Sequence, residues 1–404
     1  MSALEELKKY EEYIYRCIHC KTCRMAYTDD PEKIYPENCP AGKKFEWEAF
    51  YNSGKMWILK AILEGELDWN ERVAEIFYLC PTCGNCQQQC ENDIPTVEII
   101  EAVRAVCVEK GLGPLPRQKM FGELTAKYRN PYGEPHEKRL DWLPSDIRNS
   151  LPEKADVYYF VGCTASYRIQ NVALATVSVL RKLGINFTIS PDEWCCNSPL
   201  LRTGQLSLAK EYMQHNIDVI EKTGASVVIT SCAGCYRTLK VDFPRFVGKY
   251  DFEVKHSVEF IYDLIQEGKL DPSKFKKINL VATYHDPCHY GRHIVLRMED
   301  RKKKEEFFEV PRKIIEYLGI ELREMRRIKA DSWCCGAGGG VKAGAPDFAL
   351  ETAMERIKEA LETGAQALLS ACPFCYRNLT DAIKAMNAKL EFYDLIELLD
   401  KAIQ

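Results

Sequence analysis

Cysteine is the residue whose number and spacing in this 404-residue chain most directly indicate chemistry. Nineteen cysteines are present, and all but Cys107 belong to four ordered sets. The first set is Cys17, Cys20, Cys23 and Cys39, and the second is Cys80, Cys83, Cys86 and Cys90. The third is Cys163, Cys195, Cys196, Cys232 and Cys235, and the fourth is Cys288, Cys334, Cys335, Cys372 and Cys375. Thiolates at short, repeated spacings hold iron–sulfur clusters, so we expect the chain to transfer electrons.

The first two sets follow the ligand pattern of a ferredoxin that holds two cubane [4Fe–4S] clusters. In such ferredoxins the fourth cysteine of each run binds the other cluster. This rule predicts one cluster on Cys17, Cys20, Cys23 and Cys90, and a second on Cys80, Cys83, Cys86 and Cys39. The 15-residue gap between Cys23 and Cys39 departs from the usual spacing of three. Zinc fits less well, because structural zinc sites use pairs of cysteines rather than triplets followed by a fourth.

Composition excludes several classes of protein. Hydrophobic residues make up 46% and charged residues 28% of the chain, as in folded soluble proteins. The formal net charge of −4 argues against a general nucleic-acid binder. The sequence contains no apolar run long enough for a membrane helix and no apolar core of a secretory signal near its start. We therefore expect a cytoplasmic location, where thiols stay reduced and bind metals rather than form disulfides.

The pattern of elements predicts an α+β protein. Residues 1–112 read as helices around the first two cysteine sets, and residues 113–153, rich in Pro, Gly and charge, read as a surface linker. Residues 154–275 and 276–404 are a tandem duplication. Each copy reads as a strand ending in Cys, a helix, a strand ending in Cys-Cys, a helix and a strand ending in Cys-x-x-Cys. Such βαβ units form parallel sheets and place functional groups at the carboxyl ends of the strands.

The duplicated motif is Cys-x(31–45)-Cys-Cys-x(35–36)-Cys-x-x-Cys, and it resembles the CCG domain family. This family includes the B and D subunits of heterodisulfide reductases and the iron–sulfur subunits of glycolate, lactate and glycerol-3-phosphate dehydrogenases. A two-cluster ferredoxin domain fused to two CCG domains is similar to the D-subunit layout. The segments HDPCHYGRH and WCCGAGGGV resemble the heterodisulfide reductase and sulfite-reductase-associated branch more than the glycolate branch. Copy one departs from the family pattern at Asn197, where glycine is frequent.

The resemblance implies a particular chemistry. Each five-cysteine set would bind a noncubane [4Fe–4S] cluster, with the adjacent pairs Cys195-Cys196 and Cys334-Cys335 as bridging and terminal ligands. A partner, a membrane b-type cytochrome or a flavoprotein, would feed electrons through the two cubanes to these clusters. There a disulfide of the coenzyme M–coenzyme B type would be reduced to two thiols. The chain itself would lie on the inner face of the membrane through its partner.

Two alternatives remain open at this stage. The glycolate-type relatives suggest an electron-relay protein that passes electrons from a flavoprotein dehydrogenase to a quinone and has no substrate of its own. The other alternative is a scaffold in which one five-cysteine copy binds zinc.

Several residues that are not cysteines are candidates for substrate contact. They are Arg168, Arg237, His289, Arg292, His293 and Arg377. Arginines bind anionic groups well, but Arg237 and Arg377 also fit helix ends or surface ion pairs. His285 and His289 flank Cys288. They could deliver protons to a leaving thiolate, or they could stabilise the turn around Cys288. We expect Gly338, Gly339 and Gly340 to leave room for a cluster to approach the backbone, and we expect Cys107 to be a small residue of the apolar core.

Overall fold

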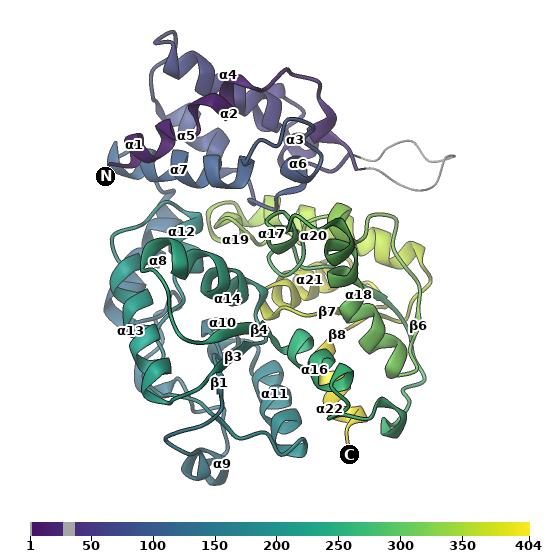
Figure 1. Ribbon diagram of the computed structural model, residues 1–404. Coiled ribbons are helices and arrows are strands. Elements are labelled where there is room, and N and C mark those ends of the chain that lie inside the picture. The colour runs from purple at the N-terminus through teal and green to yellow at the C-terminus, as the bar shows by residue number, and fades with distance from the viewer. Residues whose placement is uncertain (1, 27–36) are drawn as a thin grey trace.

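The structure is a computed structural model that describes residues 2–26 and 37–404. An N-terminal helical block lies across one end of two α/β units (Figure 1). The expected α+β class, with a helical iron–sulfur domain followed by two parallel α/β units, is confirmed.

The N-terminal block packs short helices around an apolar core. Its helices are α1 (Ala3–Lys8), α2 (Glu11–Tyr15), α3 (Pro40–Phe45), α4 (Asn52–Leu63), α5 (Glu71–Tyr78), α6 (Asn85–Gln88) and α7 (Thr96–Glu109). Helix α7 contacts both α1 and α5 and buries Val103 and Cys107 in the same core as Phe77. Most of the cysteines of the first two sets lie in the turns between these helices, and Cys86 lies in the first turn of α6.

Each copy of the duplication forms its own sheet of four parallel strands. The first sheet has the order β2-β1-β3-β4 and the second has the order β6-β5-β7-β8. The strands are β1 (Val157–Tyr159), β2 (Phe187–Thr188), β3 (Val227–Thr230), β4 (Glu253–His256), β5 (Val281–Tyr284), β6 (Glu321–Leu322), β7 (Ala367–Ser370) and β8 (Glu391–Asp394). The identical order of the two sheets shows that the duplication seen in the sequence is a duplication of the fold.

Helices cover both sheets and join them. Copy one contains α10 (Cys163–Tyr167), α11 (Gln170–Lys182), α12 (Ser198–Arg202), α13 (Ala209–Lys222), α14 (Ala233–Arg237), α15 (Phe243–Phe246) and α16 (Ser257–Gln266). Copy two contains α17 (Arg292–Val295), α18 (Arg301–Tyr317), α19 (Val341–Gly344), α20 (Pro346–Glu362), α21 (Pro373–Ala385) and α22 (Leu395–Ala402). Helix α11 packs on α22, and α16 packs on α18. Buried residues from both copies therefore share two apolar core clusters.

Each copy ends in a strand that the sequence pattern did not predict. Strands β4 and β8 occupy one edge of their sheets, and each begins with an exposed residue and ends with a buried one. Both are followed directly by an amphipathic helix that opens with a capping box, at His256 and at Asp394. Their short alternating runs lack the apolar stretch that marks the central strands, because an edge strand is buried less completely.

Residues 113–153 are more than the surface linker that we predicted. They form α8 (Pro116–Tyr128) and α9 (Ser145–Ser150), and α8 contacts both α12 and α19. Leu140, Trp142 and Leu143 are buried in the same core as the residues of β1. The Pro and Gly residues mark the turns of this segment, but its apolar side chains anchor it to the fold.

The N-terminal block meets the two units at the carboxyl ends of their strands, where α12, α17 and α19 lie (Figure 1). Within the described residues, no helix combines the length and apolar character needed to cross a membrane.

Candidate metal centres

The first site gathers cysteines from both ferredoxin-like runs. Cys17, Cys20, Cys23 and Cys90 line one small cavity. Cys20 is exposed, and it is the only exposed cysteine among the nineteen, all of which lie in the described part of the chain. The set is the one that the ferredoxin rule predicts, with Cys90 supplied by the second run. We call it the distal site.

The second site gathers Cys39, Cys80, Cys83 and Cys86, and we call it the proximal site. Cys86 lies near Cys39, Cys80 and Cys83, and also near enough to Cys23 of the distal site for their charges to interact. Cys39 joins this set from the N-cap of α3, where its sulfur accepts the Gly42 N–H at 3.4 Å. The long gap before Cys39 therefore does not prevent the predicted pairing.

Burial makes these thiols poor acids without a metal. Burial raises the pKa of Cys39 to about 12 and also raises the pKa values of Cys17 and Cys23. A metal cation reverses this, because it stabilises the thiolate form. Four unpaired cysteines around one small space, from loops with the ferredoxin spacing, fit a cubane cluster at each site.

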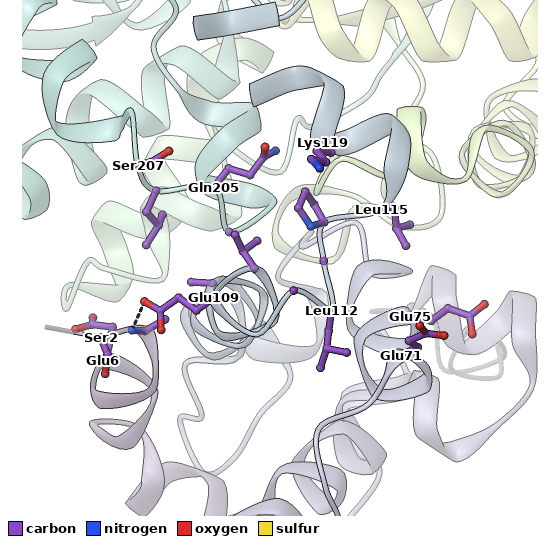
Figure 2. Close-up of a pocket in the computed structure, with 18 of the residues that line it drawn as sticks. Ser2, Glu6, Glu71, Glu75, Glu109, Leu112, Leu115, Lys119, Gln205 and Ser207 are labelled. Carbon is purple, nitrogen blue, oxygen red and sulfur yellow. Dashed lines mark hydrogen bonds between the residues drawn. The ribbon is translucent and has the colours of Figure 1, made fainter. Parts of the chain in front are cut away.

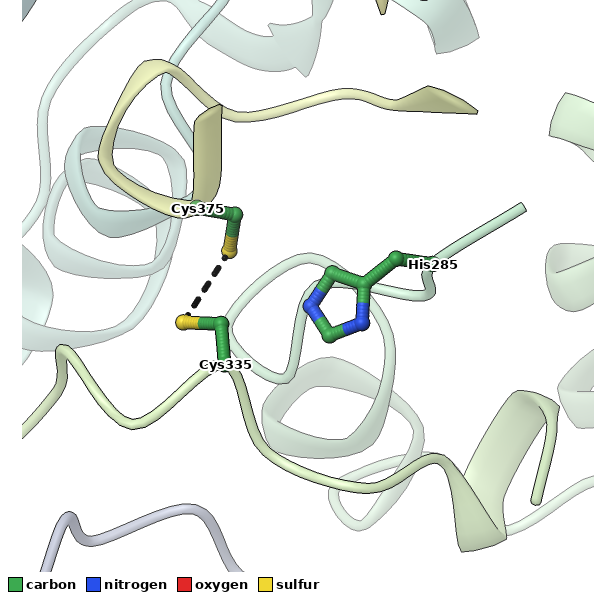
Figure 3. A group of neighbouring side chains, drawn as sticks. All are labelled: His285, Cys335 and Cys375. Carbon is green, nitrogen blue, oxygen red and sulfur yellow. Dashed lines mark hydrogen bonds between the residues drawn. The ribbon is translucent and has the colours of Figure 1, made fainter. Parts of the chain in front are cut away.

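The two five-cysteine sets lie at the carboxyl ends of the central strands. In copy one, Cys163 follows β1, the Cys195-Cys196 pair follows β2, and Cys232 and Cys235 follow β3. In copy two, Cys288, Cys334, Cys335, Cys372 and Cys375 occupy the same places after β5, β6 and β7. All ten are buried and none forms a disulfide. The sulfur atoms of Cys335 and Cys375 are 3.5 Å apart (Figure 3).

The proximal site, copy two and copy one form a continuous series of sulfur contacts, and the distal site lies beside the proximal site. The proximal site touches copy two, because Cys83 packs with Cys288 and Cys334 and hydrogen bonds with Cys334. Copy two touches copy one through a hydrogen bond between Cys372 and Cys232. The order from the surface inward is therefore distal site, proximal site, copy two and copy one.

Long polar side chains hold the proximal loop against the two units. Arg104, which is fully buried, donates to the carbonyls of Cys80, Arg202 and Gly339. Arg292 Nε donates to the Cys83 carbonyl at 2.9 Å, and His293 Nε2 donates to the Thr82 carbonyl at 2.9 Å. Arg292 and His293 thus support this loop and are buried away from the cavity described below, so we do not retain them as substrate contacts.

The glycine run after Cys335 provides close contact between the N-terminal block and copy two. A Cβ atom on Gly339, whose φ is +60°, would lie 2.5 Å from the Cys80 carbonyl oxygen. A Cβ atom on Gly338 would lie 2.6 Å from the Pro81 carbonyl oxygen. These glycines make room for the backbone of the proximal loop rather than for a phosphate group.

A cavity of about 710 Å³ separates the two copies. Its walls include all five cysteines of copy one and Cys288, Cys335, Cys372 and Cys375 of copy two. Apolar and aromatic side chains complete the walls, among them Phe121 and Tyr132 from the segment predicted as a linker, and Phe374. The cavity therefore brings sulfur ligands of both copies to one ligand-sized space.

The predicted substrate residues divide into two groups. Arg377 and His289 line the cavity, and His289 Nδ1 is 3.2 Å from the Cys288 sulfur. Arg237 is fully buried and pairs with Glu101 at 3.0 Å and Asp242 at 3.6 Å. Arg168 pairs with Glu134 at 2.7 Å on the surface. Arg237 and Arg168 therefore have structural partners, and we do not retain them as substrate contacts.

Sequence reasoning missed other residues at the cavity. Lys342 and Lys384 line it together with Arg377, and Lys342 Nζ is 2.6 Å from both Asn378 Oδ1 and Asp381 Oδ2. The sequence carries little signal for these positions, because isolated lysines on helices are usually solvated. The place of Lys384 on α21 becomes informative only once that helix is placed against the cavity.

A second, larger cleft of about 1530 Å³ lies between the N-terminal block and copy one. Figure 2 shows the carboxylates of Glu6, Glu71, Glu75 and Glu109 around it. None of the cysteines lines this cleft, so it is not a centre of the sulfur chemistry.

Comparison with known families agrees with this architecture. The model of a cysteine-rich domain, CCG, matches residues 157–240 and 282–380. The model of a 4Fe-4S dicluster domain matches residues 13–94.

Relatives of known name cover most of the chain. It is 42% identical to the D subunit of dihydromethanophenazine:CoB–CoM heterodisulfide reductase from Methanosarcina acetivorans, over 96% of this chain and 93% of the relative. It is 30% identical to the B subunit of the fumarate reductase (CoM/CoB) from Methanothermobacter marburgensis, over 82% of this chain and 62% of the relative. It is 28% identical to the EtfAB:quinone oxidoreductase of Syntrophomonas wolfei, over 82% of this chain and 47% of the relative.

The fold and the sites together define an iron–sulfur oxidoreductase that joins a two-cluster ferredoxin module to a duplicated cysteine-rich unit. The chain belongs to the CCG family and, within it, to the family of heterodisulfide reductase D subunits.

Proposed function

We propose that the protein reduces a small disulfide of the coenzyme M–coenzyme B type to two thiols. One observation carries the proposal: cysteines of both copies line a single cavity of about 710 Å³. Reduction of a disulfide consumes two electrons and two protons and yields two thiols. A cavity with a redox-active site on each side suits this stoichiometry, since each sulfur of the substrate then faces its own site.

The residues that would hold the cofactors follow from the grouping of the cysteines. The distal and proximal sites would each hold a cubane [4Fe–4S] cluster, and the two five-cysteine sets would each hold a noncubane [4Fe–4S] cluster. When bound, these clusters supply one-electron transfers. His289 lines the cavity with Nδ1 3.2 Å from Cys288, where it can hold a proton beside the substrate sulfur.

The electron donor would be a partner protein that docks near Cys20, the one exposed cysteine of the described chain. The similarity to the D subunit of a dihydromethanophenazine-dependent enzyme supports a membrane b-type cytochrome, on the inner face of the membrane, in this role. The domain limits that we propose are residues 1–112, 113–153, 154–275 and 276–404, with the second acting as a packed connector.

The test is disulfide reduction by protein purified without oxygen, with a reduced viologen dye as electron donor. We expect release of two thiols per disulfide consumed, and we expect the coenzyme M–coenzyme B disulfide to be the best substrate. Dye oxidation with no candidate disulfide, together with fast electron transfer to a quinone, would contradict the proposal. That result would favour the relay function, which the similarity to the EtfAB:quinone oxidoreductase supports.

A further inference from the structure

The two five-cysteine sites differ at one buried position. His285 lies three residues before Cys288 in copy two, and Phe160 lies three residues before Cys163 in copy one. Both side chains are buried at the carboxyl end of the corresponding strand, His285 after β5 and Phe160 after β1. The two copies thus have equivalent positions here, occupied by a polar ring in copy two and by an apolar ring in copy one.

The contacts of His285 fix which ring nitrogen carries the proton. Nδ1 lies 3.1 Å from Arg356 Nε, and an arginine can only donate a hydrogen bond, so Nδ1 is the acceptor. Arg356 is held in place by Glu359 at 2.7 Å and by Ser332 at 3.1 Å. The neutral ring therefore carries its hydrogen on Nε2.

Nε2, the ring nitrogen of His285 that carries the hydrogen, faces only the sulfur atoms of the copy-two site. Nε2 of His285 is buried and makes no hydrogen bond with a nitrogen or oxygen atom of the described residues. The imidazole lies beside Cys335 and Cys375, with one ring nitrogen and the two sulfur atoms all within 4.8 Å of one another (Figure 3). A nitrogen that carries hydrogen donates to sulfur but cannot ligate a metal, so the geometry favours a hydrogen-bond donor over a sixth ligand.

We propose that His285 Nε2–H donates a hydrogen bond to the metal-bound Cys335 sulfur and thereby raises the reduction potential of the copy-two site. A hydrogen bond to a ligand sulfur stabilises the reduced, more negative form of the cluster. Phe160 offers no donor at the equivalent place in copy one, where a different residue, the buried Arg139, donates to the Cys163 sulfur at 3.8 Å. The reduction takes up one electron from a one-electron carrier and breaks no bond.

The position of copy two in the series of sulfur contacts gives the His285 donor a use. Copy two touches the proximal site through Cys83 and Cys334, whereas copy one touches copy two through Cys232 and Cys372. The His285 donor thus acts on the copy that lies next to the proximal site. The inference rests on the proposed cluster in copy two but needs no disulfide substrate.

The test is a redox titration followed by EPR on anaerobically purified protein, with His285→Phe, His285→Gln and Phe160→His as variants. We expect His285→Phe to keep its iron and to lower the midpoint potential of the copy-two signal, by about 59 mV for a tenfold loss of electron occupancy. His285→Gln restores an N–H donor and should recover most of the potential. Phe160→His should leave the copy-two signal unchanged, which makes it the matched control. A Cys163→Ser variant identifies the copy-two signal by removing that of copy one.

The other outcomes separate the failure of this proposal from the failure of the proposed function. An unchanged potential in His285→Phe with full iron content would mean that the ring only fills space. Loss of iron from copy two in both His285→Phe and His285→Gln would mean that His285 is a ligand or a fold support. Wild-type protein with no iron in the copies would overturn this proposal together with the proposed cofactors, whereas inactivity toward disulfides with normal titrations would overturn the proposed function alone.

Discussion

At the scale of single residues, Arg377 is the side chain of the cavity that best suits binding of a negatively charged group. Arg377 lines the cavity, and its guanidinium lies 5.7 Å from the centre of the Tyr132 ring. Among the described residues, no carboxylate forms an ion pair with it, in contrast to Arg202, which pairs with Glu101 and Asp242. An arginine without a carboxylate partner in a ligand cavity suits a negatively charged substrate.

We expect Arg377→Gln to raise the KM for an anionic disulfide by about tenfold to a hundredfold, with kcat little changed. Loss of a charged hydrogen bond costs about 1.5–3 kcal/mol of binding free energy. Steady-state kinetics with the viologen dye measures both constants. Arg168→Gln is the matched control, because Arg168 lies outside the cavity in a surface ion pair. An equal effect on an uncharged disulfide would show that Arg377 shapes the cavity rather than binds charge.

Two cysteine variants, one in copy two and one in the apolar core, distinguish a proposed cluster ligand from a packing residue. We expect Cys335→Ser to lose the iron of copy two and disulfide reduction together, because Cys335 lies among the five cysteines of that set. Cys107→Ala should keep full iron content, since Cys107 is fully buried among apolar residues and burial raises its pKa to about 12. Iron analysis and the dye assay measure both properties. Wild-type disulfide reduction by Cys335→Ser protein that lacks this iron would contradict the proposed site.

At the scale of elements, the contact between the proximal loop and the glycine run joins the N-terminal block to copy two. Arg104, Arg292 and His293 are held in place here, because each donates to a backbone carbonyl of residues 80–83. Gly338 and Gly339 permit the close approach from the other side. This contact sets the distance between the proximal site and copy two, on which electron transfer depends.

We expect Gly339→Ala to lower the free energy of unfolding by about 1–3 kcal/mol more than Gly65→Ala does, from overpacking against the Cys80 carbonyl. Both glycines have positive φ, +60° and +76°, so both substitutions strain the backbone. Only Gly339 has neighbours in the way, since a Cβ on Gly65 meets no atom within 4 Å among the described residues. Thermal unfolding under anaerobic conditions measures the difference. Equal losses for the two variants would show that the close contact contributes nothing to stability.

At the scale of the whole molecule, the sites follow one another from the surface to the cavity. Cys20 of the distal site is exposed, and the ten cysteines of the two copies are buried. Electrons entering at the distal site would have one short path inward, and the cavity between the two copies lies at the inner end of this path. In the proposed function, this arrangement separates the surface on which the partner would dock from the space in which the disulfide would react.

Much of this organisation follows from the sequence, because cysteine spacing and strand pattern are local signals. The grouping of Cys90 with the first run follows from cysteine spacing, and the duplicated α/β fold follows from spacing together with the strand pattern. The roles of Arg292 and His293 cannot be predicted from the sequence, because their carbonyl partners at Cys83 and Thr82 lie 209 and 211 residues away along the chain. Proximity to a cysteine in the sequence suggested substrate contact, whereas the fold turns both side chains toward the N-terminal block.

The measurement that tests the central claim most directly is the iron content of anaerobically purified protein, with EPR during stepwise oxidation in the presence of candidate thiols. Four clusters require about 16 iron atoms per chain. We expect this content, together with a new EPR signal that appears with one thiol of the coenzyme M or coenzyme B type and not with others. About 8 iron atoms per chain, with no thiol-dependent signal, would mean that only the ferredoxin-like sites hold clusters and would contradict a disulfide reductase built on the duplicated copies.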